Sequence, residues 1–402
     1  MKVPFSQRTA WDLRPNAIAR RKMERQLEQR PPRFDLTEGN PTHVGLGWDA
    51  GALRAALDVR GAERYEPEPQ GLESARNAIA AHHASRGFPL QARALFLTAS
   101  TSDAYSWVFK LLADPGDAVL VPRPGYPLFD YLAGLESIAV EHYAMRFDGD
   151  WWLDLAGIRE RLAAATGPRV RAVVVVNPGN PTGAYLSVDE VRALADVCAE
   201  HGVAIVSDEV FADYAHAADP NRDGRGRLES LAGVTSALTF SLSGLSKVAA
   251  LPQVKLGWVH VGGPPHDAAE ACRRLEVIAD TWLPAGTPVQ LAAPALLAGA
   301  SRVQAKILER VRENLRVLRA QVTPDSPVSV LPVEGGWYAV LRAPSATSDD
   351  DRVLELLDAD DVLVQPGYFF DFEQPGHLVV SLLPEPATFA EGAARLVSRL
   401  SR

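Results

Sequence analysis

Short apolar runs alternate with helix-like segments through the middle of the chain. The runs ALFLT, AVLVP, RAVVVVN, VAIVSD, ALTFSL and KLGWVHV lie between residues 94 and 261, and helical segments such as 102–113 and 188–200 separate several of them. Runs that are apolar on both faces and separated by helices are typical of a mostly parallel sheet covered on two sides. The pattern therefore predicts an α/β fold, with a three-layer domain built on a mostly parallel sheet.

The two ends of the chain have a different pattern. Helical segments are expected before the first apolar run, over 17–30, 50–58 and 72–86. Long helical segments follow Gly263, over 268–279 and 303–322, and lead to the runs GGWYAVL, DVLVQPG and HLVVSLL and to a last helix over 388–400. We predict a smaller α+β domain here, which the N-terminal segment joins. The expected division is an N-terminal segment 1–45, a large domain 46–285 and a small C-terminal domain 286–402.

Composition narrows the functional classes. The 402 residues suggest two or three domains at roughly 150 residues each, and the net charge of −9 argues against a nucleic-acid surface. Two cysteines make no disulfide framework, and the nine histidines show no metal-ligand spacing, so we expect no metal site. The N-terminus lacks the apolar stretch of a signal peptide, and no apolar run approaches the roughly 18 residues of a membrane span. We therefore expect a cytoplasmic protein that binds neither membranes nor nucleic acid.

Two small-residue turns have the composition of ligand-binding loops. The first, TASTSDA (98–104), lies between a strand and a helix, where hydroxyls and free backbone N–H groups can hold an anion; an ordinary helix N-cap is the alternative. The second, NPGNPTG (177–183), directly follows the strand RAVVVV. Its prolines and glycines make a rigid turn that can present Asn180 to a site, and a purely structural loop is the alternative.

Two further segments place a carboxylate and an amine at strand ends. Asp208, in IVSDEVF, is either a helix N-cap or a carboxylate in a poorly solvated pocket, aimed at a cation. Lys247, in FSLSGLSK, is either solvated or desolvated with a lowered pKa, which would make its amine nucleophilic towards a carbonyl. These four features are the parts needed to hold pyridoxal phosphate: the anion-binding turn 98–104, called the anion cup below, the turn that presents an asparagine, the carboxylate and the nucleophilic lysine.

With these motifs in order, the sequence resembles the fold type I aminotransferases, the class I/II or aspartate-aminotransferase-like family. The segments TEGNPT, YEPEPQG, DPGDAVLVPRPGYP, NPGNPTG, SDEV and SGLSK follow one another as in that family, over most of the chain. The resemblance implies a transferase of amino acid metabolism, a transaminase that moves an amino group between an amino acid or other amine and a 2-oxo acid. It also implies pyridoxal 5′-phosphate as cofactor and a homodimer with shared active sites.

The same resemblance implies a role for each matching residue. Lys247 would form a Schiff base, the internal aldimine, with the cofactor and then serve as general base and acid. Asp208 would pair with the pyridine nitrogen, Asn180 would donate to the ring's O3′, and Tyr126 would stack on the ring. The phosphate would be held by small hydroxylated residues, a basic residue after the lysine and a tyrosine of the other subunit: Ser100, Thr101, Ser102, Ser243, Lys255 and Tyr65.

Three positions depart from the family pattern. Lys255 stands where the family has an arginine, which keeps the charge but loses the bidentate fork; a surface lysine is the alternative. Phe211 replaces a tyrosine that donates to O3′, so Asn180 would act alone and the aldimine pKa would be higher. Val379 stands where an arginine binds the substrate α-carboxylate, so either another arginine takes over or the substrate lacks that group. Aromatic residues of the small domain form core, dimer contacts or a hydrophobic substrate pocket: Trp337, Tyr338, Tyr368, Phe369 and Phe370.

Two other functions compete with transamination. A C–S or β-lyase acting on a cysteine-like amino acid would use the same cofactor and differ in where the electrons go after the first proton transfer. A cofactor-binding regulator that has lost catalysis is the third hypothesis, and the joint presence of Lys247, Asp208 and Asn180 argues against it.

Overall fold

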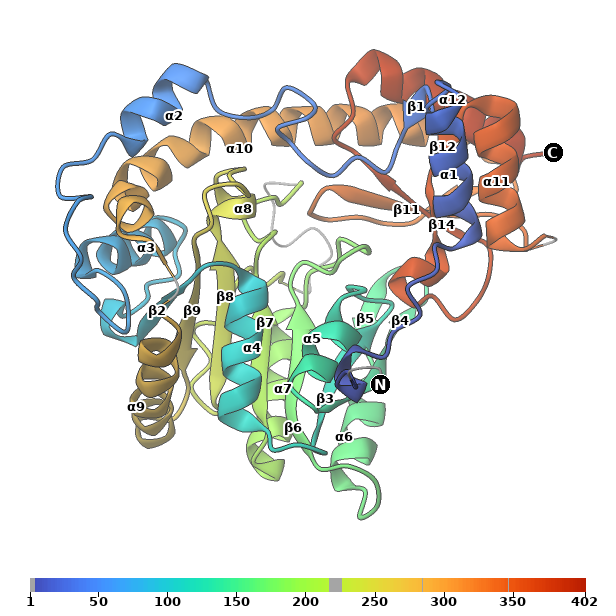
Figure 1. Cartoon of the computed structure of the whole chain (residues 1–402). Coiled ribbons are helices and arrows are strands. Elements are labelled where there is room, and N and C mark those ends of the chain that lie inside the picture. Colours follow the sequence, from blue (N-terminus) through green and yellow to red (C-terminus); the bar gives the residue numbers. More distant parts are fainter. Residues whose placement is uncertain (1–3, 217–225, 284, 346) are drawn as a thin grey trace.

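A central eight-stranded sheet dominates the computed structural model, which describes residues 4–216, 226–283, 285–345 and 347–402 (Figure 1). Its strand order is β2-β9-β8-β7-β6-β3-β4-β5. The pairs β3–β4, β3–β6, β6–β7 and β7–β8 are parallel, whereas β9 runs antiparallel to β8 and β2, and β5 antiparallel to β4. The predicted mostly parallel sheet is therefore confirmed. The strands are β2 (Leu95–Thr98), β3 (Ala118–Arg123), β4 (Ala139–Phe147), β5 (Trp151–Leu153), β6 (Val170–Val176), β7 (Ala204–Asp208), β8 (Thr239–Gly244) and β9 (Gly257–Gly262).

Helices cover both faces of this sheet, which explains why the strand sequences are apolar on both sides. Val174 of β6 lies in a core with side chains of α4 (Thr101–Leu112), α5 (Phe129–Leu135) and α9 (Pro265–Trp282). Its neighbours Val173 and Val175 face the opposite core, which includes side chains of α6 (Leu155–Ala163) and α7 (Val188–His201). Adjacent strand residues point to opposite faces, so the run of valines serves two cores at once.

A second, four-stranded antiparallel sheet lies beside the first, with the order β10-β11-β14-β13. It shares one apolar core with α11 and α12. This confirms the predicted α+β part, while the predicted domain boundaries stay predictions. The elements are β10 (Ser329–Val330), β11 (Tyr338–Arg342), α11 (Asp349–Asp360), β12 (Val362–Leu363), β13 (Gln365–Pro366), the 3₁₀ helix η3 (Gly367–Phe370), β14 (His377–Ser381) and α12 (Pro386–Leu400).

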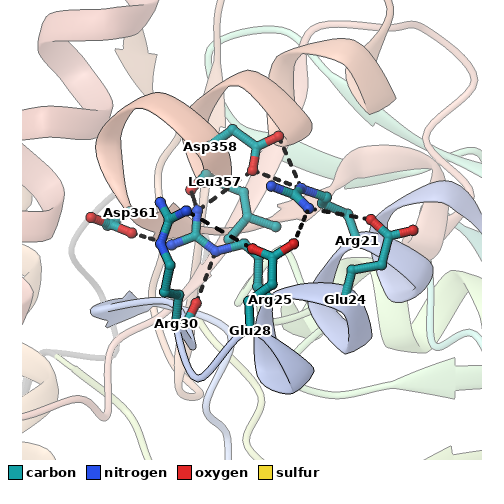
Figure 2. Close-up of polar contacts among 8 residues, drawn as sticks. All are labelled: Arg21, Glu24, Arg25, Glu28, Arg30, Leu357, Asp358 and Asp361. Atoms are coloured by element: carbon teal, nitrogen blue, oxygen red, sulfur yellow. Dashed lines mark hydrogen bonds and ion pairs between the residues drawn. The ribbon is translucent and has the colours of Figure 1, made fainter.

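The N-terminal segment packs on this second part of the chain. After the 3₁₀ helix η1 (Gln7–Thr9) comes α1 (Ala17–Leu27), which contacts α11, and β1 (Phe34–Asp35) pairs in parallel with β12. Figure 2 shows the contact: Arg25, 1% exposed, donates to the carbonyl of Leu357 and to the carboxylate of Asp361. The remaining elements before the sheet are α2 (Ala50–Leu57), α3 (Glu73–Ser85) and the 3₁₀ helix η2 (Ala92–Ala94).

One long helix, α10 (Thr287–Gln321), contacts α2, α3 and α8 (Leu245–Val248) along the large sheet and α12 beside the small one (Figure 1). The sequence predicted this helix only over 303–322, because Pro294 lacks an N–H donor and disfavours a helix interior. Burial of Ala292, Ala293 and Leu296 against the large domain's core outweighs that cost. Within the described residues, no helix has the length and apolarity needed to cross a membrane.

Candidate active site

Asp208 and Lys247 lie at the same edge of the large sheet. Asp208 is the last residue of β7, which pairs in parallel with β8, where Leu242 is its register partner. Lys247 follows β8 directly, in the single turn of α8. The carboxyl ends of adjacent parallel strands therefore bring the two side chains together, and each acts electrostatically on the pKa of the other.

Asp208 is a buried carboxylate rather than a helix cap. Burial raises its pKa to about 6, and three contacts act in the opposite direction: hydrogen bonds from the Val210 backbone N–H and from the Tyr105 hydroxyl, each 3.1 Å long, and the charge of Lys247. The residues after it form a turn and no helix. The N-cap alternative is thus wrong.

Lys247 is half-buried, and its amine lies among aromatic rings. Its Nζ is 5.6 Å from the ring centroid of Phe211 and 5.1 Å from that of Trp337. Desolvation lowers the pKa of Lys247, against the opposing effect of Asp208. The Tyr214 hydroxyl donates to the Lys247 backbone carbonyl at 2.6 Å and holds α8 in place. A desolvated amine is more often uncharged, which favours attack on a carbonyl.

The asparagine-bearing turn uses its two asparagines differently. Both polar atoms of the Asn177 side chain already form hydrogen bonds: Nδ2 donates to the Leu228 carbonyl at 2.7 Å, and Oδ1 accepts from the Leu186 N–H at 3.0 Å. The Asn180 amide has a buried Oδ1 with no hydrogen-bond partner within the described chain. Amide oxygen and nitrogen can exchange places by a flip, so Asn180 is the one available to a ligand.

Tyr126 lies in the loop after β3, and its ring meets Phe129 edge-on at 5.8 Å between centroids. Burial raises its pKa to about 12, and the charge of Asp208 adds to the shift. The aromatic ring predicted to stack on the cofactor therefore lies within electrostatic range of the predicted pyridine partner.

The residues predicted to make the anion cup lie at the first turn of α4. Ser100 is the N-cap, its Oγ accepting from the Asp103 N–H at 3.2 Å, and Thr101 and Ser102 follow. Gly257 of β9 lies directly against this turn: a Cβ there would be 2.9 Å from the Ser100 carbonyl carbon and 3.1 Å from the Thr101 nitrogen. The N-cap alternative and the anion-site hypothesis thus describe the same turn, because the capped helix still directs free N–H groups outwards.

Two further candidates for phosphate binding, Lys255 and Ser243, differ in exposure. Lys255 is exposed, with a left-handed φ of 61°, in the turn before β9. Burial raises the pKa of Asp103, and Lys255 is among the charges that oppose this, so its ammonium lies near the cup. Ser243 is buried on β8, two residues before the helical turn that carries Lys247.

Tyr65 does not join this group within one chain. It is 73% exposed and borders a groove with Leu283 and Thr287. Its predicted role requires a second copy of the chain.

The three departures from the family pattern are visible in the structure. Phe211 is buried and packs edge-on against Trp337, with centroids 5.2 Å apart. Val379 is fully buried in an apolar cluster. Lys255, as described above, lies near the cup. The buried members of the cluster are Trp151, Ala184, Leu331, Val340, Phe370 and Val379.

The aromatic residues of the small domain divide into several groups. Trp337 belongs to the core and Phe370 to the apolar cluster, while Tyr368 lies at the surface, its hydroxyl donating to Asp350 at 2.7 Å. Tyr338 lies beside the N-terminal segment: a Cβ added to Gly39 would be 2.5 Å from its hydroxyl. Core packing thus accounts for Trp337 and Phe370.

Sequence reasoning missed two tyrosines that touch the central pair. Tyr105 donates to Asp208 and Tyr214 to the Lys247 carbonyl. In the sequence they lie in the mixed segments SDAYSW and FADYAH and have no motif of their own, so no local signal could have identified them.

The family model for aminotransferase class I and II matches residues 35–396. The chain belongs to this family. Its aminotransferase function, its fold type and its use of pyridoxal phosphate, all predicted from the motifs, are thereby confirmed.

Individual relatives of this aminotransferase support the same assignment. It is 27% identical over 374 residues to the glutamate-pyruvate aminotransferase AlaA of Haemophilus influenzae, covering 91% of this chain and 90% of that protein. A crystal structure of an Escherichia coli aminotransferase superimposes with a TM-score of 0.84 at 24% identity, covering 100% of this chain and 99% of that one, which shows the shared fold. The S-alkyl-thiohydroximate lyase SUR1 of Arabidopsis thaliana is 29% identical over 271 residues, covering only 64% of this chain and 56% of that protein.

The residues present fit the family's cofactor. The buried, unpartnered amide oxygen of Asn180 and the close approach of Gly257 to the cup leave polar groups directed at one edge of the sheet. The donors match the parts of pyridoxal phosphate: an amine for the aldehyde, a carboxylate for the ring nitrogen and N–H groups for the phosphate. Among the residues described, no three His, Cys, Asp or Glu side chains are grouped so that they could hold a metal ion.

Proposed function

We propose that this aminotransferase uses Lys247 as the covalent anchor of its cofactor and as the group that moves a proton at the substrate carbon. When bound, pyridoxal phosphate supplies an electron sink for that carbon. The placement of Lys247 and Asp208 at the carboxyl ends of adjacent parallel strands supports the proposal most directly. The lowered pKa of Lys247 suits both tasks, because a less basic amine gives up its proton more readily.

The other residues hold and orient the cofactor in this proposal. Asp208, ionised above about pH 6, keeps the ring nitrogen positively charged. The Asn180 amide donates to O3′, where Phe211 offers no hydroxyl, and Tyr126 covers one ring face. The phosphate is bound by the hydroxyls and N–H groups of the cup, by Ser243 and by the charge of one lysine: Ser100, Thr101, Ser102, Ser243 and Lys255.

We propose an amino acid with a small or apolar side chain as donor and a matching 2-oxo acid as acceptor. The support is the apolar cluster around Val379, which aromatic rings link to the lysine: Tyr338 is 6.3 Å from Phe211 and 6.4 Å from Phe370, between centroids. Alanine, whose 2-oxo acid is pyruvate, is the first donor to test, since pyruvate is also named for the AlaA relative.

We also propose a cytoplasmic homodimer in which Tyr65 of a second copy reaches the phosphate. The exposure of Tyr65 in its own chain supports this, because an exposed tyrosine is available for such a contact. Analytical ultracentrifugation gives the oligomeric state, and Tyr65→Phe should weaken retention of pyridoxal phosphate if the contact exists.

Chemical trapping tests the assignment of the lysine. Borohydride reduction of the holoenzyme, followed by peptide mass spectrometry, should place a phosphopyridoxyl group on Lys247. Lys247→Ala should abolish this label and activity, whereas Lys306→Ala, which removes an exposed lysine of α10, should change neither. A label on another lysine would contradict the proposal.

A substrate panel separates transaminase from lyase. Single-turnover spectra with alanine, leucine, phenylalanine, aspartate and glutamate should show conversion to pyridoxamine phosphate, most readily with the apolar members. Release of ammonia and pyruvate from cysteine-like amino acids, without that conversion, would favour the lyase instead.

A further inference from the structure

A buried tyrosine touches the aspartate that faces the cofactor site and has no part in the chemistry proposed above. Tyr105 lies in the second turn of α4 and is 1% exposed. Its hydroxyl donates to Oδ2 of Asp208 at 3.1 Å. Its ring packs edge-on against Phe129 at 5.6 Å and at a tilt against Phe109 at 5.7 Å, between centroids. Ring packing and the hydrogen bond together set the direction of the hydroxyl.

We propose that Tyr105 is the positioning residue of Asp208: its hydroxyl fixes one carboxylate oxygen and stabilises the ionised form that a positively charged ring nitrogen requires. This inference rests on the role proposed above for Asp208. The backbone N–H of Val210 holds the other oxygen, Oδ1, at 3.1 Å. A carboxylate has about four acceptor sites, so both oxygens are held and acceptor sites remain for the ring nitrogen.

The groups around Asp208 fix the direction of the effect. Tyr105 faces it from α4, Lys247 from α8 and Tyr126 from the loop after β3. Burial raises the pKa of both tyrosines, so both stay protonated and Tyr105 acts as donor. Burial also raises the pKa of Asp208 to about 6, and the Tyr105 hydrogen bond opposes that rise. Removing the hydroxyl therefore raises this pKa further and lowers the ionised fraction near neutral pH.

Tyr105→Phe tests the role, because it keeps the packed ring and removes only the hydroxyl. Tyr143→Phe is the matched control: Tyr143 is also buried, but its hydroxyl donates to the Val174 carbonyl at 2.8 Å and not to Asp208. Each apoprotein is titrated with pyridoxal phosphate by fluorescence quenching at about pH 6 and about pH 8. We expect Tyr105→Phe to bind about tenfold more weakly at the lower pH and with a smaller loss at the higher pH.

A double-mutant cycle provides the second measurement. In an Asp208→Asn background, Tyr105→Phe should cause no further pH-dependent loss of affinity, since the ionisable partner is gone. A loss of thermal stability without any change in affinity, or the same fold-loss at both pH values, would assign Tyr105 a structural role only and overturn the inference. A wild-type protein that carries no label on Lys247 would instead contradict the proposed function, so the two failures are distinguishable.

Discussion

Burial has opposite consequences for the two ionisable groups at the centre of the site. Desolvation disfavours charge, so it raises the pKa of Asp208 and lowers the pKa of Lys247. The opposite charges partly offset both shifts. The result is a carboxylate with a raised pKa beside an amine with a lowered one, and shifts of this kind are common at functional sites.

Cofactor affinity should therefore depend on pH through Asp208. Below about pH 6 the carboxyl group is protonated in the apoprotein and must lose that proton before it can pair with a cation. Affinity should fall as the pH drops, by up to about tenfold per pH unit. Fluorescence titration of the apoprotein measures it, and pyridoxal in place of the phosphate ester removes the titration of the phosphate itself. Asp208→Asn should bind weakly at every pH; a wild-type affinity for pyridoxal that stays constant would contradict the assignment.

At the scale of elements, the site is built where strands end and one helix begins. In the proposed site, the turn after β6 supplies the amide, the last residue of β7 the carboxylate, the helical turn after β8 the amine, and the first turn of α4 the cup. The close packing of β9 on the first turn of α4 is what shapes the cup, because only a glycine at position 257 leaves room for the backbone of Ser100 and Thr101.

Gly257→Ala should therefore damage cofactor binding. Its new methyl carbon would lie 2.9 Å from backbone and must displace the cup. We expect loss of pyridoxal phosphate on dialysis, measured by absorbance, together with a destabilisation of about 1–3 kcal/mol. Gly262→Ala, at the other end of the same strand, meets nothing closer than 3.4 Å and should retain the cofactor. Equal retention by both variants would mean that the cup tolerates displacement.

Features that depend on local sequence could be predicted, whereas features that depend on packing between distant elements could not. The strand-turn-helix pattern and the motifs around Asn180, Asp208 and Lys247 are local, and the parallel sheet brings their ends together. Tyr105 and Gly257 contribute through packing between elements distant in the sequence, which no local pattern records. The start of α10 was missed for the same reason, because burial rather than local preference decides it.

At the scale of the whole molecule, the N-terminal segment is tied to the C-terminal part by a buried arginine. Arg25 of α1 donates to the carbonyls of Leu357 and Arg30 and to Asp361, and Arg21 donates to Asp358 at 2.8 Å (Figure 2). Most of these contacts join residues more than 300 positions apart, so losing them would weaken the attachment of the N-terminal segment to the C-terminal part.

Arg25→Ala should destabilise the protein by about 2 kcal/mol, because buried acceptors lose their donor and the guanidinium leaves a cavity. Urea unfolding measures the change, and limited proteolysis should cut between α1 and β1 sooner than in wild type. Arg14→Ala removes an exposed ion pair with Asp12 and should change stability by less than about 0.5 kcal/mol. Equal stability of the two variants would show that the buried contacts contribute nothing net.

The long helix α10 has a consequence for the reactive lysine. Gln304, near its middle, donates from Nε2 to the carbonyl of Val248 at 2.8 Å, one residue beyond Lys247. The same helix, α10, also contacts α12. The turn that carries Lys247 is therefore attached to a helix that also contacts α12 of the smaller part. A displacement of α12 along α10 would change the position of the amine without any change in the substrate.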